Sequence, residues 1–155
     1  MVLLAAAVLF FGLALGDRAD IKYEKCCEPP TAFPAGCLSK DLSLQIGSCN
    51  YDSCILDRNA TIQIKFVFTS GQNTTDFFLD ATISSWADIM MPFPGLEYNL
   101  CHRLLKCPLI ENKRYTWTME IPAPDFVNPG ERILRLRSVG DRGTMFCANV
   151  NVTLN

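Results

Sequence analysis

The stretch Ile62-Gln-Ile-Lys-Phe-Val-Phe68 decides the fold class, because large apolar residues occupy every second position in it. Successive side chains of a strand point to opposite faces, so this period of two predicts a strand with one buried face. A weaker strand is expected over residues 21–25, and no segment keeps a helical period of 3.6 residues. The same alternation recurs over residues 42–46, 79–83, 115–121, 134–137 and 146–154.

Turn signals separate these segments, among them Ser70-Gly71, Asn128-Pro129-Gly130 and the stretch 140–143. Six or seven short strands joined by such turns are typical of an all-β sandwich built from two sheets. Repeats and linkers are lacking, so residues 17–155 are expected to form a single domain.

The first 16 residues are expected to be a signal peptide. The run MVLLAAAVLFFGLAL is apolar but too short to span a bilayer, and Ala14-Leu15-Gly16 is a small-x-small cleavage pattern before Asp17. The chain is therefore predicted to be secreted and extracellular, with a lysosomal location as the alternative. Its formal net charge of −2 gives no electrostatic support for a nucleic-acid partner.

Eight cysteines in a secreted chain predict a disulfide framework. Cys49 and Cys54 can close one local loop, and Cys101 and Cys107 can close another. Adjacent cysteines of an extended segment point in opposite directions. We therefore favour the pairs Cys26–Cys147 and Cys27–Cys37, and the swapped pairing is the alternative.

Three sequons make Asn59, Asn73 and Asn151 candidate glycosylation sites, which would place them at the surface. Catalysis is not expected, because the single histidine, His102, lies in a short cysteine loop and no Gly-x-Ser-x-Gly motif is present. The lack of a Cys-x-x-Cys pair gives no support for zinc, and no other cofactor is predicted.

The inward positions of the predicted strands carry unusually large side chains. A closed sandwich would simply fill its core with them, whereas a sandwich with splayed sheets would use them to line a cavity. Periodicity favours neither arrangement. The residues are Phe66, Phe68, Phe77, Tyr115, Trp117, Met119 and Phe146.

At several motifs the chain resembles the ML lipid-recognition domains, and within them the small soluble Niemann–Pick type C sterol-transfer protein and the group-two mite allergens. The most specific likeness runs from Pro92 to Trp117, and the whole likeness covers nearly all of the chain after the leader. The motifs are Lys25-Cys26, the Cys49–Cys54 loop, the strand 62–68, Met91-Pro-Phe-Pro94, Cys101…Cys107-Pro-Leu109, Tyr115-Thr-Trp117 and Gly140-Asp-Arg-Gly-Thr-Met-Phe-Cys147.

The resemblance implies an immunoglobulin-like sandwich of two antiparallel sheets with a lipid cavity between them. It also implies three disulfides, matching Cys49–Cys54, Cys101–Cys107 and an N-terminal cysteine with Cys147. The segment from Cys27 to Cys37 departs from the family pattern. With the family in view, the cavity interpretation of the aromatic interior becomes the favoured one. The expected lipid-binding residues are Phe66, Phe68, Phe93, Pro94, Tyr115, Trp117, Ala123, Phe126, Val127 and Phe146.

The resemblance also implies a function, which is non-enzymatic binding and transfer of a sterol or another small lipid. Alternatives are an innate-immune module for microbial lipids such as lipopolysaccharide, and an extracellular carrier of semiochemicals or fatty acids. Expected partners besides the lipid are an anionic membrane surface or a lipid-accepting membrane protein. Arg132, Arg135 and Arg137 are a candidate basic stripe for the membrane contact, or an ordinary solvated strand face.

Overall fold

The computed structural model describes residues 20–27, 36–94, 96 and 98–155. The predicted leader, residues 1–16, lies outside the described residues. Within them the chain forms strands and one short 3-10 helix, η1, and no α-helix. The strands are β1 (Glu24–Lys25), β2 (Lys40–Ile46), β3 (Ile55–Leu56), β4 (Thr61–Thr69), β5 (Phe78–Ser84), β6 (Met90–Pro92), β7 (Arg114–Pro122), β8 (Gly130–Gly140) and β9 (Gly143–Leu154), and η1 is Leu100–His102.

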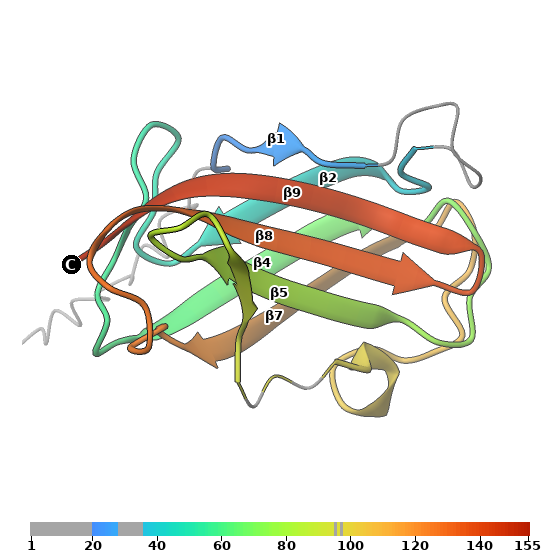
Figure 1. Ribbon diagram of the computed structural model, residues 1–155. Coiled ribbons are helices and arrows are strands. Elements are labelled where there is room, and N and C mark those ends of the chain that lie inside the picture. Colours follow the sequence, from blue (N-terminus) through green and yellow to red (C-terminus); the bar gives the residue numbers. More distant parts are fainter. Residues whose placement is uncertain (1–19, 28–35, 95, 97) are drawn as a thin grey trace, which may run out of the picture.

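The strands form two sheets that face each other, as Figure 1 shows. One sheet has the order β1-β9-β8-β5-β6, and the short β3 also pairs with β9. The other sheet has the order β2-β4-β7. All pairings are antiparallel except that of β3 with β9, which covers two residues on each strand. The predicted all-β, two-sheet sandwich is therefore confirmed.

The long strands coincide with the alternating segments of the sequence. In β4 the residues Ile62, Ile64, Phe66 and Phe68 are buried, whereas the residues between them are exposed or half-buried. This alternation follows from the pleat, which turns one face of the strand to the core and the other to solvent. The two short strands β3 and β6 were not predicted, because two or three residues are too few to show a period.

The core between the sheets is rich in contacts between aromatic rings. Phe66 of β4 stacks on Trp117 of β7 with ring centroids 4.4 Å apart, and its ring lies 5.6 Å from that of Phe146 on β9. Phe68 and Phe77 stack at 5.4 Å. The Phe66–Phe146 pair joins the two sheets, so these rings form the central layer of the sandwich.

Four disulfides join the cysteines in the favoured arrangement rather than in the swapped one. Cys26–Cys147 connects the segment after β1 to β9 across 121 positions of sequence, and Cys27–Cys37 closes a separate short loop. The two local bridges are Cys49–Cys54 and Cys101–Cys107. The described cysteines include no free thiol.

The predicted turn at Ser70-Gly71 has a specific steric requirement. A Cβ atom at Gly71 would lie 1.2 Å from the carbonyl oxygen of Leu38, so only glycine allows the two backbones to approach this closely. Within the described residues, no helix has the length and hydrophobicity needed to cross a membrane.

Candidate functional site

A cavity of about 350 Å³ opens between the two sheets at one side of the sandwich. One wall comes from the chain after β6, the last strand of the larger sheet, and the opposite wall comes from β7, the edge strand of the smaller sheet. We call this cavity the β6–β7 mouth. Its lining residues are Phe93, Pro94, Leu96, Arg103, Leu104, Thr118, Met119, Glu120, Ile121 and Pro122.

The floor of the β6–β7 mouth is apolar because of the alternation along β7. Met119 and Ile121 are buried inward-facing positions of that strand, and both line the cavity. Among the described residues that line the cavity, only Arg103 and Glu120 are charged, and both are exposed. The cavity therefore combines an apolar interior with one positive and one negative side chain at its rim.

Phe93 is held in place at the opposite wall. Its side chain is only 1% exposed, and its N–H donates to the carbonyl oxygen of Ala81 on β5 at 3.1 Å. The ring of Phe126 meets the ring of Phe93 edge to face, with centroids 6.2 Å apart. Phe126 itself remains 42% exposed, so an aromatic pair connects the cavity wall to the surface.

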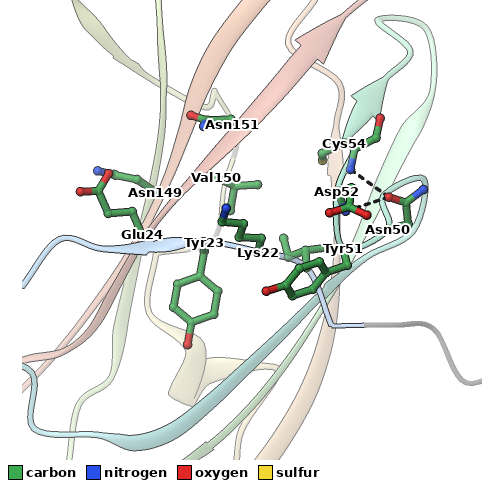
Figure 2. A pocket seen from close by; sticks show the side chains of 12 residues that line it. Lys22, Tyr23, Glu24, Asn50, Tyr51, Asp52, Cys54, Asn149, Val150 and Asn151 are labelled. Atoms are coloured by element: carbon green, nitrogen blue, oxygen red, sulfur yellow. Dashed lines mark hydrogen bonds between the residues drawn. The ribbon is translucent and has the colours of Figure 1, made fainter.

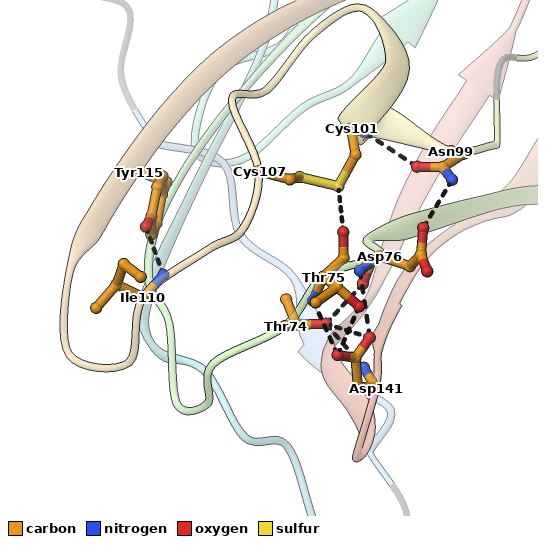
Figure 3. Close-up of a disulfide and its surroundings, with 9 residues drawn as sticks. All are labelled: Thr74, Thr75, Asp76, Asn99, Cys101, Cys107, Ile110, Tyr115 and Asp141. Carbon is orange, nitrogen blue, oxygen red and sulfur yellow. Dashed lines mark hydrogen bonds between the residues drawn. A yellow bond between two sulfur atoms is a disulfide. The ribbon is translucent and has the colours of Figure 1, made fainter.

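The loop that carries Arg103 and Leu104 is anchored by a disulfide and by a polar network (Figure 3). The Cys101–Cys107 bridge closes the loop, and the Asn99 side chain caps η1 by accepting the N–H of Cys101 at 3.0 Å. The amide of Asn99 also donates to the carboxylate of Asp76 at 3.2 Å. These contacts fix the rim of the cavity to the β4–β5 connection.

Asp141 completes this network from the β8–β9 turn (Figure 3). Its carboxylate accepts the N–H of Thr75 at 2.8 Å, the hydroxyl of Thr75 at 3.0 Å and the N–H of Asp76 at 3.2 Å. The backbone N–H of Thr75 is the main cause that lowers the pKa of Asp141 to about 2, and the hydroxyl of Thr74 adds to it. Asp141 therefore fastens the β8–β9 turn to the segment that supports the rim.

A larger but more polar pocket, of about 550 Å³, lies beside β1 and β9 (Figure 2). It shares no lining residue with the β6–β7 mouth. Lys22, Glu24, Tyr51 and Asn149 are among its lining residues. Tyr23 also lines it, and its hydroxyl donates to the carbonyl oxygen of Leu42 at 2.7 Å. Burial, and secondarily the charge of Asp20, raises the pKa of Tyr23. The β6–β7 mouth is the better candidate for an apolar ligand, because its floor is formed by buried apolar side chains.

The described residues include no group of three or more side chains that could hold a metal ion. The sequons at Asn59, Asn73 and Asn151 all have an exposed asparagine. Asn151 also lines the polar pocket of Figure 2.

The sequence profile of the ML domain matches residues 21–154. The chain belongs to the ML domain family. This is a family of lipid-recognition domains, and the resemblance seen in the motifs is confirmed.

Individual relatives agree with this membership. The chain is 24% identical to the mite group 2 allergen Tyr p 2 of Tyrophagus putrescentiae over 144 residues, which cover 93% of this chain and 94% of that protein. It is 30% identical to the mite group 2 allergen Der p 2 of Dermatophagoides pteronyssinus over 101 residues, which cover 63% and 66% of the two chains. The crystal structure of a Niemann-Pick type C2 protein from the Japanese carpenter ant shares the fold, with a TM-score of 0.69, 16% identity, and coverage of 87% of this chain and 100% of that one.

In this ML domain the residues predicted to bind lipid fall into two groups. Phe93 and Pro94 line the β6–β7 mouth. Ala123 and Val127 are buried just beyond β7, and Phe126 packs on Phe93. The deeper group consists of rings that contact one another in the core, namely Phe66, Phe68, Tyr115, Trp117 and Phe146.

Tyr115 has an additional structural contact, because its hydroxyl accepts the N–H of Ile110 at 2.7 Å (Figure 3). The sequence placed Met119 among the large inward side chains that could line a cavity but not among the expected lipid-binding residues, and Ile121 was in neither set although it belongs to the inward face of β7. The sequence also did not place Arg103 and Leu104 at the mouth, since nothing in a local sequence shows where a disulfide loop folds back.

The proposed basic stripe is shorter than expected. Arg135 and Arg137 share one face of β8, but Arg132 has the parity of the buried Leu134 and therefore belongs to the other face. Its guanidinium donates to the carbonyl oxygens of Asn128 and Pro129. Arg132 thus stabilises the turn before β8 and is not part of a stripe.

Proposed function

We propose that this ML domain is a non-enzymatic carrier that binds one sterol molecule, or another small lipid, through the β6–β7 mouth. The observation that carries the proposal is the apolar cavity between the edges of the two sheets, floored by Met119 and Ile121 and walled by Phe93. The relatives named above support it, because one is named as a Niemann-Pick type C2 protein. We also infer that the protein is secreted, which its disulfides support.

The size of the cavity favours a single small ligand. Pockets for small molecules usually measure about 300–1,000 Å³, and a cavity of about 350 Å³ lies near the lower limit. A multi-chain microbial lipid needs more space than the mouth offers. Each methylene group that leaves water contributes about 0.8 kcal/mol, so a sterol or a single acyl chain would gain enough from burial to bind without a covalent step.

The ligand is expected to extend from the mouth into the aromatic layer. Met119 and Trp117 are successive inward positions of β7, so the cavity floor adjoins the ring of Trp117. Phe66 and Phe146 continue this layer toward the larger sheet. Entry of a sterol would have to separate these rings, and the deeper residues would then contact it.

Exchange of the ligand is expected at a lipid surface, through the hairpin between β5 and β6. Trp86 is 78% exposed and Ile89 is 64% exposed on this hairpin. The second strand of the hairpin, β6, leads directly to Phe93 at the mouth. Aromatic and aliphatic side chains of this kind partition into the membrane interface, so contact there would bring the mouth close to a donor or acceptor membrane. Arg135 and Arg137 would add attraction to anionic lipids.

A titration of the delipidated protein with a fluorescent sterol and with a fluorescent fatty acid tests the carrier function. We expect saturable binding of at least one of them at micromolar concentration. The variant Met119→Trp fills the cavity from its floor and should weaken binding at least tenfold. Thr116→Trp places the same ring on the solvent face of the same strand and should bind as wild type does. Failure of the wild-type protein to bind either probe would refute the proposal.

A further inference from the structure

The polar pocket of Figure 2 lies at a gap in the strand pairing along one edge of β9. β8 pairs with the other edge of β9, whereas the two short strands β1 and β3 pair with this one. β1 pairs with Ala148 and Asn149, and β3 pairs with Thr153 and Leu154. Residues 150–152 therefore have no partner among the described strands on this edge, and the pocket of about 550 Å³ occupies the gap.

Asn151 stands in the middle of this gap and is the acceptor of the sequon Asn151-Val-Thr153. It is exposed, and its side-chain amide forms no hydrogen bond within the described part of the chain. It lines the polar pocket and also an adjoining pocket of about 430 Å³. A bulky, hydrophilic group attached to this amide would therefore find preformed space at the surface.

The other two sequons do not offer the same setting. The side-chain oxygen of Asn73 accepts the backbone N–H of Glu111 at 2.9 Å, so that amide already belongs to a structural contact. Asn59 lies in the connection between β3 and β4 and is not a lining residue of the polar pocket. Of the three, Asn151 is the sequon that joins an uncommitted amide to this pocket.

The lining of the polar pocket suits a sugar better than an apolar ligand. Tyr51 lines it and is 59% exposed, and its hydroxyl has no hydrogen-bond partner among the described residues. A phenol ring has a flat apolar face, which can pack against the C–H face of a pyranose ring. Donors and acceptors for sugar hydroxyls are supplied by Lys22, Glu24, Asp52 and Ser53.

A sugar between Asn151 and Tyr51 would connect β9 to the loop that the Cys49–Cys54 bridge closes. That loop contacts β9 at its end, where the N–H of Thr153 donates to the carbonyl oxygen of Cys54 at 2.8 Å. Packing of a sugar on Tyr51 would add a second contact nearer to the tip of the loop.

We propose that Asn151 carries an N-linked glycan whose first N-acetylglucosamine residues lie in the polar pocket against the ring of Tyr51. In the transfer, the Nδ2 atom of Asn151 bonds to the anomeric carbon of the sugar, the bond from that carbon to the diphosphate of a lipid-linked oligosaccharide donor breaks, and the amide proton passes to a base of the transferase. The inference is independent of lipid carriage. It requires the secretion inferred above, because donor and transferase belong to the secretory pathway.

The first test maps the glycans on the full chain, expressed with its own leader in eukaryotic cells. Peptide-N-glycosidase in heavy-oxygen water converts each occupied asparagine to labelled aspartate, which mass spectrometry of the peptides locates. We expect the label at Asn151. Secreted protein without label at Asn151 would overturn this proposal, and retention of the chain inside the cells would overturn the inferred secretion as well. Lipid binding is measured on the same protein, so a failure of the carrier function is seen separately.

The second test measures thermal unfolding of the secreted protein in a double-mutant cycle. Asn151→Gln and Tyr51→Ala should each lower the Tm by about 3 °C, and the double variant should be no less stable than either single variant. Tyr51→Phe keeps the ring and should keep the wild-type Tm. Asn59→Gln is the matched control, because it removes a sequon outside the pocket, and its effect should simply add to that of Tyr51→Ala.

Two further variants of the experiment separate the glycan from other causes. Thr153→Ala removes the same sequon and should behave as Asn151→Gln does, which excludes an effect of the glutamine itself. Additive effects of Asn151→Gln and Tyr51→Ala would overturn the proposed contact. Free diacetylchitobiose offers the same sugar from another source, and its saturable binding to Asn151→Gln at micromolar concentration would identify a site for another molecule's glycan and overturn the assignment to the chain's own.

Discussion

The carboxylate of Asp141, in the turn between β8 and β9, accepts the backbone N–H of Thr75 at 2.8 Å, although 66 positions of sequence separate the two residues. The same carboxylate accepts the N–H of Asp76, whose own side chain accepts from Asn99 at the start of the rim loop. The Asp141 carboxylate therefore joins the β8–β9 turn to the β4–β5 connection, and the Asp76 carboxylate extends this link to the loop that carries Arg103.

This contact predicts a specific loss of stability in acid. The pKa of Asp141 is lowered to about 2 in the folded protein, whereas an aspartate in an unfolded chain titrates near 4. The stabilisation is therefore complete above about pH 4 and disappears as the pH falls through about 2. In urea unfolding, Asp141→Asn should be less stable than wild type by a constant amount from pH 5 to 7, and the difference should shrink between pH 4 and 2. Asp80→Asn, at an exposed position of β5, is the matched control, and a pH-independent difference for Asp141→Asn would contradict the prediction.

Removal of the Cys101–Cys107 bridge should affect both stability and binding. Replacing both cysteines by serine frees a short loop and should lower the free energy of unfolding by about 2 kcal/mol. Because this loop holds Arg103 and Leu104 at the β6–β7 mouth, the fluorescent lipid should also dissociate faster.

The matched control for that variant is the serine replacement of Cys27 and Cys37, a second short bridge that lies after β1 rather than at the mouth. It should lower stability without changing the dissociation rate. Equal effects of the two variants on dissociation would show that the rim loop has no special role. Denaturant titration and stopped-flow fluorescence supply the two measurements.

The aromatic pair at the cavity wall predicts a kinetic effect. Phe126→Ala removes the ring that packs on Phe93 but leaves the cavity floor unchanged. We expect a several-fold faster release of bound lipid, measured by transfer to excess cyclodextrin, with a change in stability below about 1 kcal/mol because Phe126 is already 42% exposed. Phe126→Leu should restore most of the slow release, and an unchanged rate in Phe126→Ala would exclude the ring as a cover of the mouth.

The proposed membrane contact of the hairpin between β5 and β6 can be tested by substituting two exposed isoleucines, one on the hairpin and one elsewhere. Ile89→Ser removes apolar surface from the hairpin between β5 and β6, and Ile110→Ser removes a similar group from the loop after Cys107, where Ile110 is 48% exposed. If the hairpin contacts membranes, Ile89→Ser should slow transfer of lipid between vesicles several-fold without changing affinity in solution. Ile110→Ser should transfer at the wild-type rate, and the idea fails if both variants transfer equally fast.

The fold class was predictable because its long strands contain enough residues to show the alternation of apolar and polar side chains. β4 and β7 each keep four large apolar residues in alternation, so the alternation alone identifies the buried face of each strand. The short strands β3 and β6 gain their conformation from pairing with β9 and β5, which no local pattern reveals.

The candidate site was only partly predictable, because some of its residues are brought to it by contacts that no local sequence pattern reveals. Phe93 and Pro94 belong to a motif and were named, whereas Arg103 and Leu104 reach the mouth only through the fold of the Cys101–Cys107 loop. The place of Arg132 on the other face of β8 was predictable, because in the sequence it alternates with Arg135 and Arg137 as Leu134 does, and β8 begins before it at Gly130.

The bridge between Cys26 and Cys147 also determines how the domain would respond to mechanical load. It links positions 121 residues apart, so tension applied to the two ends of the chain passes through the sulfur atoms and bypasses β2 to β8. Among the described strands, β1 and the last part of β9, from Ala148 to Leu154, lie outside the segment that the bridge closes. Tension could therefore separate β1 from β9, and the end of β9 from β8 and β3. While the bridge is intact, pulling on the ends would leave both walls of the β6–β7 mouth unloaded.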